Sequence, residues 1–441
     1  MSESKRRFRR DFLRRGSLMA LGSAFGGVRA MVTIIALAEF GPTTVSTYGI
    51  AVNVYGIAVV LCAGHGIAVV SRLSHLRMRG QSDAAGSEQF TEIISTAWAS
   101  TFVLVVLTCG FGAISTALIP GDRGQYVLAY AAATVGAILL PLGQCLAGKQ
   151  QFLGLERLST QHSFETFVIG TGLALLGTGV APDATTALLS IGLSGIAAEA
   201  WGFARRRDSL GERDRGIIRA GWSVFTSSPA QTLRNVPRTA AGAYDGVVLL
   251  STFALVSQLA ASVGPLPGAV TVTAIAFVRS VVIPLKSIGL VGGRLVVHRS
   301  DRRLIDSGLI RQAIGTVAYV LVPVGAALAL APWPLQHVLG LPQGHDTELV
   351  VRLVGFQLML EPIAGVGSAM LKVIVKPTAV LLPLTICMWG LTLPVIAIGS
   401  AAGALSLPTI WAVLLTARGA FCACVWVGLV RASRRRTELV A

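Results

Sequence analysis

Five polar residues recur at helical spacing within one apolar segment of the sequence. Ser223, Ser227, Gln231, Arg234 and Arg238 follow one another at steps of four, four, three and four residues, so they share one face of a helix. A central arginine costs about 2.5–3.5 kcal/mol to insert into a bilayer, and such a face therefore avoids lipid. We expect it to line a cavity that receives phosphate, because guanidinium pairs bidentately with phosphate oxygens. The alternative is a helix buried among others, with both arginines neutralised by neighbouring glutamates.

Arg29 lies in a second apolar segment that resembles the first. A shift of 205 residues aligns the two segments without a gap, and Arg29 then falls on Arg234. The same shift matches Arg14 with Arg219, Gly16 with Gly221, Gly41 with Gly246, Ser46 with Ser251 and Thr47 with Thr252. Duplicated halves are common in transporters, which hold their substrate where the halves meet. We therefore expect Arg29 and Arg234 to face each other and to hold a phosphate or diphosphate group.

Further charged residues lie inside apolar segments, where they are functional pointers by default. Glu361 and Arg418 both lie near the middle of such segments, so the two either pair with each other or leave Glu361 to couple transport to a proton or a cation. Glu165 and Glu199 lie nearer to segment ends, where structural ion pairs are expected.

The composition indicates a membrane protein. Hydrophobic residues make up 53% of the 441 residues, charged residues 13%, and the mean hydropathy is +0.69. A span needs about 20 apolar residues, and the sequence predicts twelve spans. These are expected at 16–38, 45–70, 93–118, 126–147, 163–181, 184–204, 217–242, 247–278, 312–333, 350–374, 377–399 and 407–430.

The net charge of +16 is distributed unevenly along the chain. Most of the 37 lysines and arginines lie in the two tails and in alternate connections between spans, which the positive-inside rule assigns to the cytoplasmic side. We therefore expect both termini in the cytoplasm of a bacterial cell, with the basic segments touching anionic membrane lipids. This pattern argues against nucleic-acid binding.

The basic segment at 205–216 predicts a linker between two six-helix bundles, residues 1–204 and 217–441. Six spans per half give both halves the same orientation, so the repeat is parallel. The eighth predicted span is interrupted by the two prolines of 264–268, which indicates a kink or a hinge.

Signals of catalysis are missing from the sequence. There is no glycine-lysine loop for ATP, no zinc-binding histidine pair and no Ser/His/Asp set on one membrane face. We therefore expect no enzyme activity, no cofactor and no metal. A polytopic glycan polymerase or ligase is the enzyme alternative, although such enzymes need a larger outer loop than the one near 334–349.

Several short motifs resemble those of a known superfamily. A basic N-terminus leads into a glycine-rich first helix at Gly16, and an outer turn follows at Phe40-Gly41-Pro42. Tyr48-Gly49, the glycines Gly64 and Gly66, and Arg72 complete the pattern. The chain resembles the multidrug/oligosaccharidyl-lipid/polysaccharide (MOP) flippase superfamily, and within it the Wzx-type polysaccharide and O-antigen exporters. The resemblance implies two six-helix bundles in a MATE-like V and alternating access.

The resemblance also implies a substrate and residues that bind it. Gly27-Val28-Arg29 resembles the first-helix motif of the related lipid II flippases, in which the arginine serves the diphosphate of the substrate. We therefore expect a flippase that moves a polyprenyl-diphosphate-linked oligosaccharide between leaflets of the inner membrane, with glycan-assembly enzymes as further partners. The rival interpretation is a MATE-like multidrug or cation antiporter.

Overall fold

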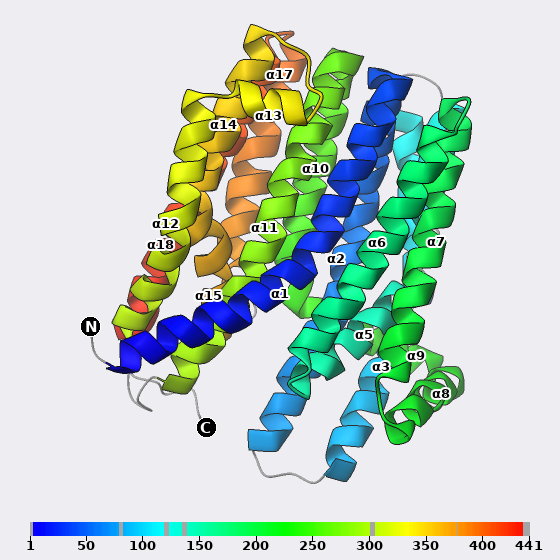
Figure 1. Cartoon of the computed structure of the whole chain (residues 1–441), viewed down its shortest axis with the longest axis vertical. Coiled ribbons are helices and arrows are strands. Elements are labelled where there is room, and N and C mark those ends of the chain that lie inside the picture. The colour runs from blue at the N-terminus through cyan, green and yellow to red at the C-terminus, as the bar shows by residue number, and fades with distance from the viewer. Residues whose placement is uncertain are drawn as a thin grey trace. The chain divides into compact units, whose positions relative to one another are not determined.

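The computed structural model describes residues 3–78, 83–118, 123–134, 139–299, 305–376 and 378–434, and the regular structure in these ranges is helical (Figure 1). Nine helical segments within them are long and apolar enough to cross a bilayer. In hydrocarbon, backbone N–H and C=O groups must be bonded within the segment, which is why continuous apolar sequence becomes helix. The expected all-helical membrane fold class is confirmed.

The chain folds into two compact units, which we call the N-terminal unit (Val32–Ala254) and the C-terminal unit (Met1–Met31 with Leu255–Ala441). The first helix, α1 (Glu3–Ala36), contributes most of its length to the C-terminal unit, and α10 (Tyr244–Val263) is divided between the two. The division into two six-helix bundles at 1–204 and 217–441 stays a prediction.

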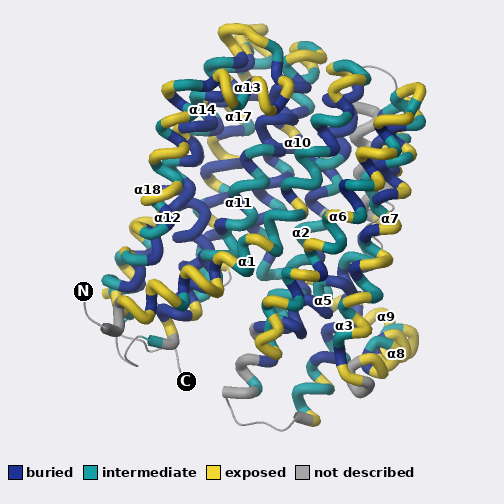
Figure 2. The backbone as a smooth tube through the Cα atoms, in the orientation of Figure 1, coloured by how far each residue is buried: buried dark blue, intermediate teal, exposed yellow. Residues whose placement is uncertain are grey.

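The N-terminal unit is built around long helices from both sequence halves. Its helices are η1 (Leu37–Phe40), α2 (Pro42–Met78), α3 (Asp83–Leu118), α4 (Arg123–Thr134), α5 (Leu140–Phe152), α6 (Glu156–Gly179), α7 (Ala184–Asp208), α8 (Glu212–Ser227), α9 (Pro229–Ala240) and η3 (Ala241–Ala243). Phe90, Ile93, Ile94, Leu142 and Leu146 form its apolar core. In Figure 2 the buried residues run along inner helix faces, whereas Leu176 on α6 is 70% exposed, as suits a side chain in lipid.

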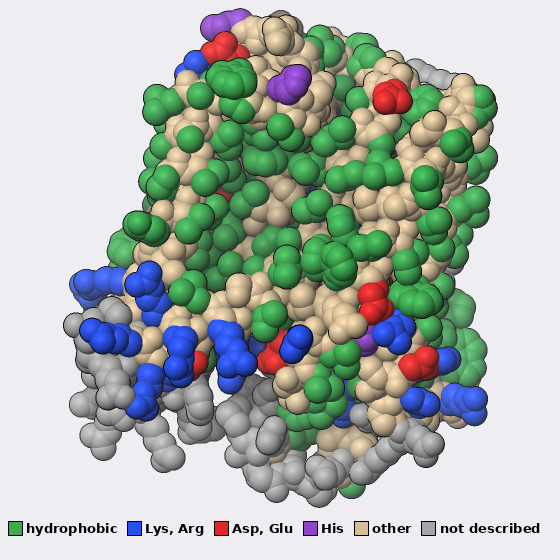
Figure 3. Space-filling view, in the orientation of Figure 1, with side chains coloured by type: hydrophobic (Ala, Val, Ile, Leu, Met, Phe, Trp, Pro, Cys, Tyr) green, Lys and Arg blue, Asp and Glu red, His purple; other side chains and the backbone are tan. Residues whose placement is uncertain are grey.

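The C-terminal unit combines the start of α1 with the helices that follow Gly264. These are α11 (Pro265–Arg299), α12 (Ser307–Leu330), α13 (Trp333–Val338), α14 (His345–Glu361), α15 (Ser368–Ile374), α16 (Leu381–Thr385), α17 (Leu393–Ala401) and α18 (Leu407–Arg434). Wide π-helical turns, η4 (Pro362–Gly367) and η5 (Ile386–Thr392), join α14 to α15 and α16 to α17. Figure 3 shows lysine and arginine side chains gathered near the ends of the chain at the lower left, and acidic and histidine side chains over the opposite end of this unit.

The helix order repeats with an offset of 223 residues, which corrects the offset of 205 expected from the sequence. Arg6–Phe40 and Pro229–Val263 are both apolar helical segments of 35 residues. Each ends at a Gly-Pro turn, Gly41-Pro42 or Gly264-Pro265, and the proline begins the next helix. The same offset relates Ala184 to Leu407, where α7 and α18 begin. It also relates the two points at which the chain passes from one unit to the other, after Met31 and after Ala254.

Two expected spans are therefore wrong. The sequence predicts an outer turn at 243–246, but Asp245 is buried and the helix continues through it to Val263. The seventh span is Pro229–Val263 instead of 217–242, and the eighth is Pro265–Val297 instead of 247–278. The two prolines of 264–268 mark the start of a new helix rather than a kink within one.

Glycine allows α1 and α11 to touch in the C-terminal unit. A Cβ on Gly27 would lie 2.7 Å from the Ser280 Cα, whereas a Cβ on the adjacent Gly26 would meet nothing within 4 Å. Small residues permit this kind of backbone approach between membrane helices.

We expect Gly27→Ala to destabilise the protein by about 1–3 kcal/mol, because the atom nearest to the new methyl group would be the backbone Cα of Ser280, which cannot move aside as a flexible side chain would. Gly26→Ala is the matched control, and better helix propensity should leave it neutral or slightly more stable. Thermal unfolding of both purified variants in the same detergent measures the difference. Equal midpoints would show that the contact at Gly27 is not tight.

Candidate functional site

The polar stripe expected on one helix lies on two. α8 ends at Ser227, Ser228 leaves helical geometry with φ −141° and ψ 62°, and α9 begins at Pro229. Ser223, Ser227, Gln231, Arg234 and Arg238 are nevertheless all exposed. Among the residues that the structure describes, Arg234 and Arg238 form no ion pair. The opposite side of α9, which carries Thr232 and Thr239, is buried.

Arg234 and Arg238 lie far from the middle of their span. At 1.5 Å per residue, the helical path from Arg234 to the turn at Gly264 is about 45 Å, and from Arg238 about 39 Å. The hydrocarbon core of a bilayer is only about 30 Å thick. The two arginines therefore belong to the basic end of the span, and Arg234 corresponds through the offset of 223 to Asp11 instead of Arg29.

Arg29, in contrast to Arg234 and Arg238, lies deep in its span. Only about 18 Å of helical path separates Arg29 from the turn at Gly41. Its neighbour in the C-terminal unit is α11, because Gly27 touches Ser280. Arg279 precedes Ser280 and lies about 22 Å from the turn at Gly264. Both arginines are half-buried, and they occupy the same level of two touching helices.

The sequence interpretation missed Arg279. It placed this residue in a cytoplasmic connection after a span that ended at 278, whereas α11 continues as helix to Arg299. The signal that could have found it is the segment after Arg279, from Ser280 to Val297, which is mostly apolar apart from Lys286 and Arg294 and is too long for a connection. The pairing of Arg29 with Arg234 stays a prediction, because the two residues belong to different units. Within the C-terminal unit, Arg279 of α11 lies at about the level of Arg29.

Glu361 and Arg418 form a buried bidentate pair in the C-terminal unit. Arg418 Nε donates to Glu361 Oε1 at 2.8 Å and Arg418 Nη2 donates to Oε2 at 2.7 Å. Both side chains are almost completely buried. Glu361 ends α14 just before the π-helical turn, and a Cβ on Gly365 would lie 2.9 Å from Oε2, so glycine leaves room for the carboxylate. Of the two expectations for Glu361, the geometry is that of a pair; a coupling role stays a prediction.

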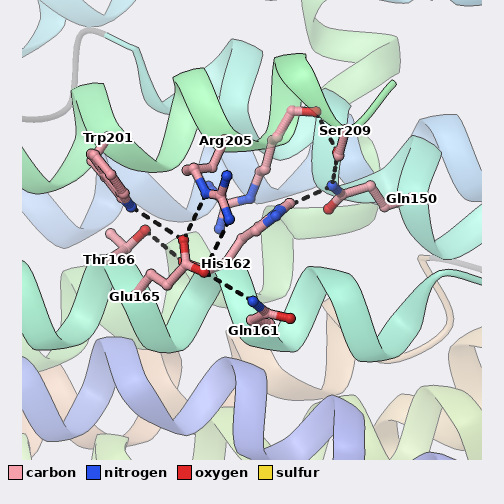
Figure 4. A network of polar contacts seen from close by, with 9 residues as sticks. Gln150, Gln161, His162, Glu165, Thr166, Trp201, Arg205 and Ser209 are labelled. Atoms are coloured by element: carbon pink, nitrogen blue, oxygen red, sulfur yellow. Dashed lines mark hydrogen bonds and ion pairs between the residues drawn. The ribbon is translucent and has the colours of Figure 1, made fainter. Parts of the chain in front are cut away.

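Glu165 binds residues of α6 and α7 near the basic end of the N-terminal unit (Figure 4). Arg205 donates to both carboxylate oxygens, at 3.0 and 3.4 Å, and Trp201 and Gln161 donate at 3.2 and 3.1 Å. Glu199 interacts electrostatically with Arg206. Glu165 thus has the geometry of a structural ion pair, and the same role for Glu199 stays a prediction.

Arg205→Gln is expected to leave the free energy of unfolding nearly unchanged, because Arg205 is exposed and surface pairs are weak. The neighbouring Arg207→Gln, which removes an exposed pair with Asp208, is the matched control. Denaturant unfolding in detergent measures both variants. A clear loss for Arg205→Gln, with none for Arg207→Gln, would show that the network in Figure 4 stabilises the unit beyond an ordinary surface pair.

Comparison with known proteins bears on the fold. No model of a known protein family matches the sequence, and no curated protein does. Among solved structures, the inward-facing conformation of a multidrug resistance MATE family transporter of the MOP superfamily matches with a TM-score of 0.72 and 15% identity, over 93% of this chain and 94% of that chain. An outward-facing conformation matches with a TM-score of 0.65 and 16% identity, over 98% of each chain. The chain has a MATE-like fold.

A third structure with this MATE-like fold is a MOP superfamily transporter from Pyrococcus furiosus, with a TM-score of 0.63 and 16% identity over 98% of each chain. Its binding pocket is described as having reverse polarity, which suggests a different function for that protein. The similar structures thus belong to the superfamily named by the sequence resemblance. At these identities the similarity concerns the fold, and it describes this chain as a multi-pass membrane protein.

Proposed function

We propose that this protein is an alternating-access transporter that moves a polyprenyl-diphosphate-linked oligosaccharide from the inner to the outer leaflet of a bacterial cytoplasmic membrane. The observation that carries the proposal is the placement of Arg29 and Arg279 at one level of α1 and α11, deep within their spans. Guanidinium groups at this depth suit a diphosphate, which accepts paired hydrogen bonds from each fork. Intramembrane charges of this kind mark substrate pathways.

The arginines of α9 extend the proposal to the entry of the substrate. Arg234 and Arg238 are exposed at the basic end of their span, together with Gln231 and Ser227. A lipid-linked diphosphate begins its passage at the inner surface, where the positive-inside rule places this end. In the proposal, the α9 residues receive the head group there, and Arg29 and Arg279 of the C-terminal unit bind the diphosphate at a second site, deep within the span. A Wzx-type exporter and its partnership with glycan-assembly enzymes would fit these steps.

The second candidate function is multidrug or cation antiport, favoured by the MATE transporters among the similar structures. A cation site needs a carboxylate that can change partner or charge. Glu361 at the end of α14 is the candidate, and Arg418 binds both of its oxygens. In an antiporter, Glu361 would therefore have to release Arg418 in order to bind a cation. The reverse polarity described for the Pyrococcus furiosus transporter supports the view that one fold accommodates pockets of opposite charge.

Reconstitution into liposomes tests the two functions against each other. We expect the protein to accelerate the transfer of a fluorescent polyprenyl-diphosphate oligosaccharide between leaflets and to leave the efflux of a cationic dye at the level of empty vesicles. Dye efflux without lipid-linked oligosaccharide transfer would overturn the flippase proposal in favour of the antiporter. Glycosyl transfer by the purified protein would instead support a polymerase.

A further inference from the structure

The C-terminal unit has an apolar groove at its basic end. The groove has a volume of about 430 Å³ and lies between α15, α16 and α18. The residues that carry the argument are Leu371, Val380, Pro383, Cys424, Gly428 and Arg431. All of them belong to one compact unit, and apart from Arg431 the side chains named are apolar or a thiol.

Small residues of α18 open this groove. Cys424, Gly428 and Arg431 follow one another at steps of four and three, so they lie along one face of the helix. A Cβ on Gly428 would lie only 2.8 Å from Leu371 Cδ2, which shows that α15 approaches α18 closely at this point. On the other side, Thr378, Ala379 and Val380 precede α16, which begins at Leu381. The result is a slot that runs along α18 and ends at Arg431.

Among the described residues that line the slot, the positive charge lies at one end. Arg431 and Ala379 both line the slot. Lys376 lies next to Ala379, because the Lys376 carbonyl oxygen accepts a hydrogen bond from Ala379 N at 2.9 Å. Arg434 follows one turn beyond Arg431. Arg431, Lys376 and Arg434 are exposed and form no ion pair with the residues that the structure describes. An apolar slot capped by cations is complementary to one acyl chain below an anionic head group.

The position of the groove along the span agrees with this occupant. α18 is apolar enough to cross the bilayer, and Arg431 and Arg434 are its last basic residues. Long basic side chains at the end of a membrane helix lie at the head-group level. The cytoplasmic leaflet is the one that attracts such clusters through its anionic lipids, at about 1 kcal/mol per basic residue.

We propose that this groove is a binding site for an anionic phospholipid of the inner leaflet, with one acyl chain between α15, α16 and α18 and the phosphate beside Arg431 and Lys376. The site lies within one unit and does not depend on what the protein transports. The proposed occupant is thus a bound membrane phospholipid. The experiment below distinguishes it from the polyprenyl tail of a substrate.

Native mass spectrometry of the full chain in detergent tests the proposal with phosphatidylglycerol and phosphatidylcholine as probes. We expect one phosphatidylglycerol to be retained in preference to phosphatidylcholine of the same chain length. Arg431→Gln should weaken phosphatidylglycerol binding about fivefold, and Lys376→Gln should weaken it by a similar factor. Both residues are exposed, so these variants should fold normally.

Two tryptophan variants separate the groove from the general lipid surface. Ala423 is exposed and lines the groove, so Ala423→Trp should fill it and abolish the preferred binding. Leu176→Trp, on the exposed face of α6, is the matched control and should leave binding unchanged. Cys424 provides a second measurement, since it is the exposed thiol among the cysteines whose burial the structure describes. Phosphatidylglycerol should slow its reaction with a membrane-soluble maleimide in the wild type and fail to do so in Arg431→Gln.

Equal retention of the two phospholipids, or unchanged binding in both Arg431→Gln and Ala423→Trp, would overturn the proposal and identify ordinary annular lipid. Displacement of phosphatidylglycerol by an uncharged polyprenol would overturn it in favour of a site for the substrate's tail. Retention of phosphatidylglycerol against a polyprenol excess, with loss in Ala423→Trp but not in Leu176→Trp, supports the site.

Discussion

Arg418→Met is expected to lower the free energy of unfolding by about 3–5 kcal/mol, the largest stability effect of any single change considered for this protein. Methionine preserves much of the volume of arginine but leaves the Glu361 carboxylate buried without its cation, and both oxygens lose a hydrogen bond shorter than 3 Å. The measurement is the unfolding transition of the purified variant in detergent.

The control for this prediction is the double variant Arg418→Met with Glu361→Leu. Replacing a buried ion pair by apolar residues of similar volume is often neutral or stabilising, so the double variant should recover most of the lost stability. If the double variant is as unstable as Arg418→Met alone, the loss comes from disturbed packing around Phe421, whose ring lies 5.3 Å from the guanidinium carbon. Transport by a stable double variant would also show that Glu361 is dispensable for coupling.

Arg279→Gln is expected to reduce transfer of a polyprenyl-diphosphate oligosaccharide by about thirtyfold or more, the factor that corresponds to losing one partner of a desolvated charge pair. Arg29→Gln should have a similar effect, because the two residues share one level of α1 and α11. Arg279→Lys should retain part of the activity, since lysine keeps the charge but loses the planar fork. Initial rates of transfer in proteoliposomes with equal protein content measure these effects.

Arg311→Gln, an exposed arginine of α12 in the same unit, is the matched control and should transport at the wild-type rate. Retained transport in both Arg279→Gln and Arg29→Gln would eliminate the proposed diphosphate site. If instead only Arg234→Gln and Arg238→Gln abolish transport, the anionic site lies at the basic end of the span and not at its middle.

Much of the helical framework follows from the sequence, because apolar runs of sufficient length in a membrane protein have little choice but helix. α2, α7, α12 and α18 overlap the spans expected for them. Glu361 and Arg418 could be predicted as a pair, since isolated charges in hydrocarbon find a counter-charge where one is within reach.

The offset of the internal repeat could not be predicted correctly from the sequence. Identities at an offset of 205 come from a few glycines, serines and arginines, which are frequent in this chain and carry little positional information. The offset of 223 is visible in the positions of the Gly-Pro turns and the helix starts, which are properties of the fold. Asp245 misled the interpretation because an acidic residue before a glycine resembles a loop, whereas the N-terminal unit buries it.

The packing of α1 against α11 has a consequence for synthesis of the protein. Gly27 leaves the ribosome about 250 residues before Ser280, its contact in the folded C-terminal unit. The nascent first helix must therefore wait in the bilayer, its arginine included, while more than half of the remaining polypeptide is translated. Contacts this distant in sequence form slowly and leave early segments open to wrong associations or quality-control proteolysis. Messages truncated before the codon for Arg299 should yield products that are degraded, however stable their other helices are.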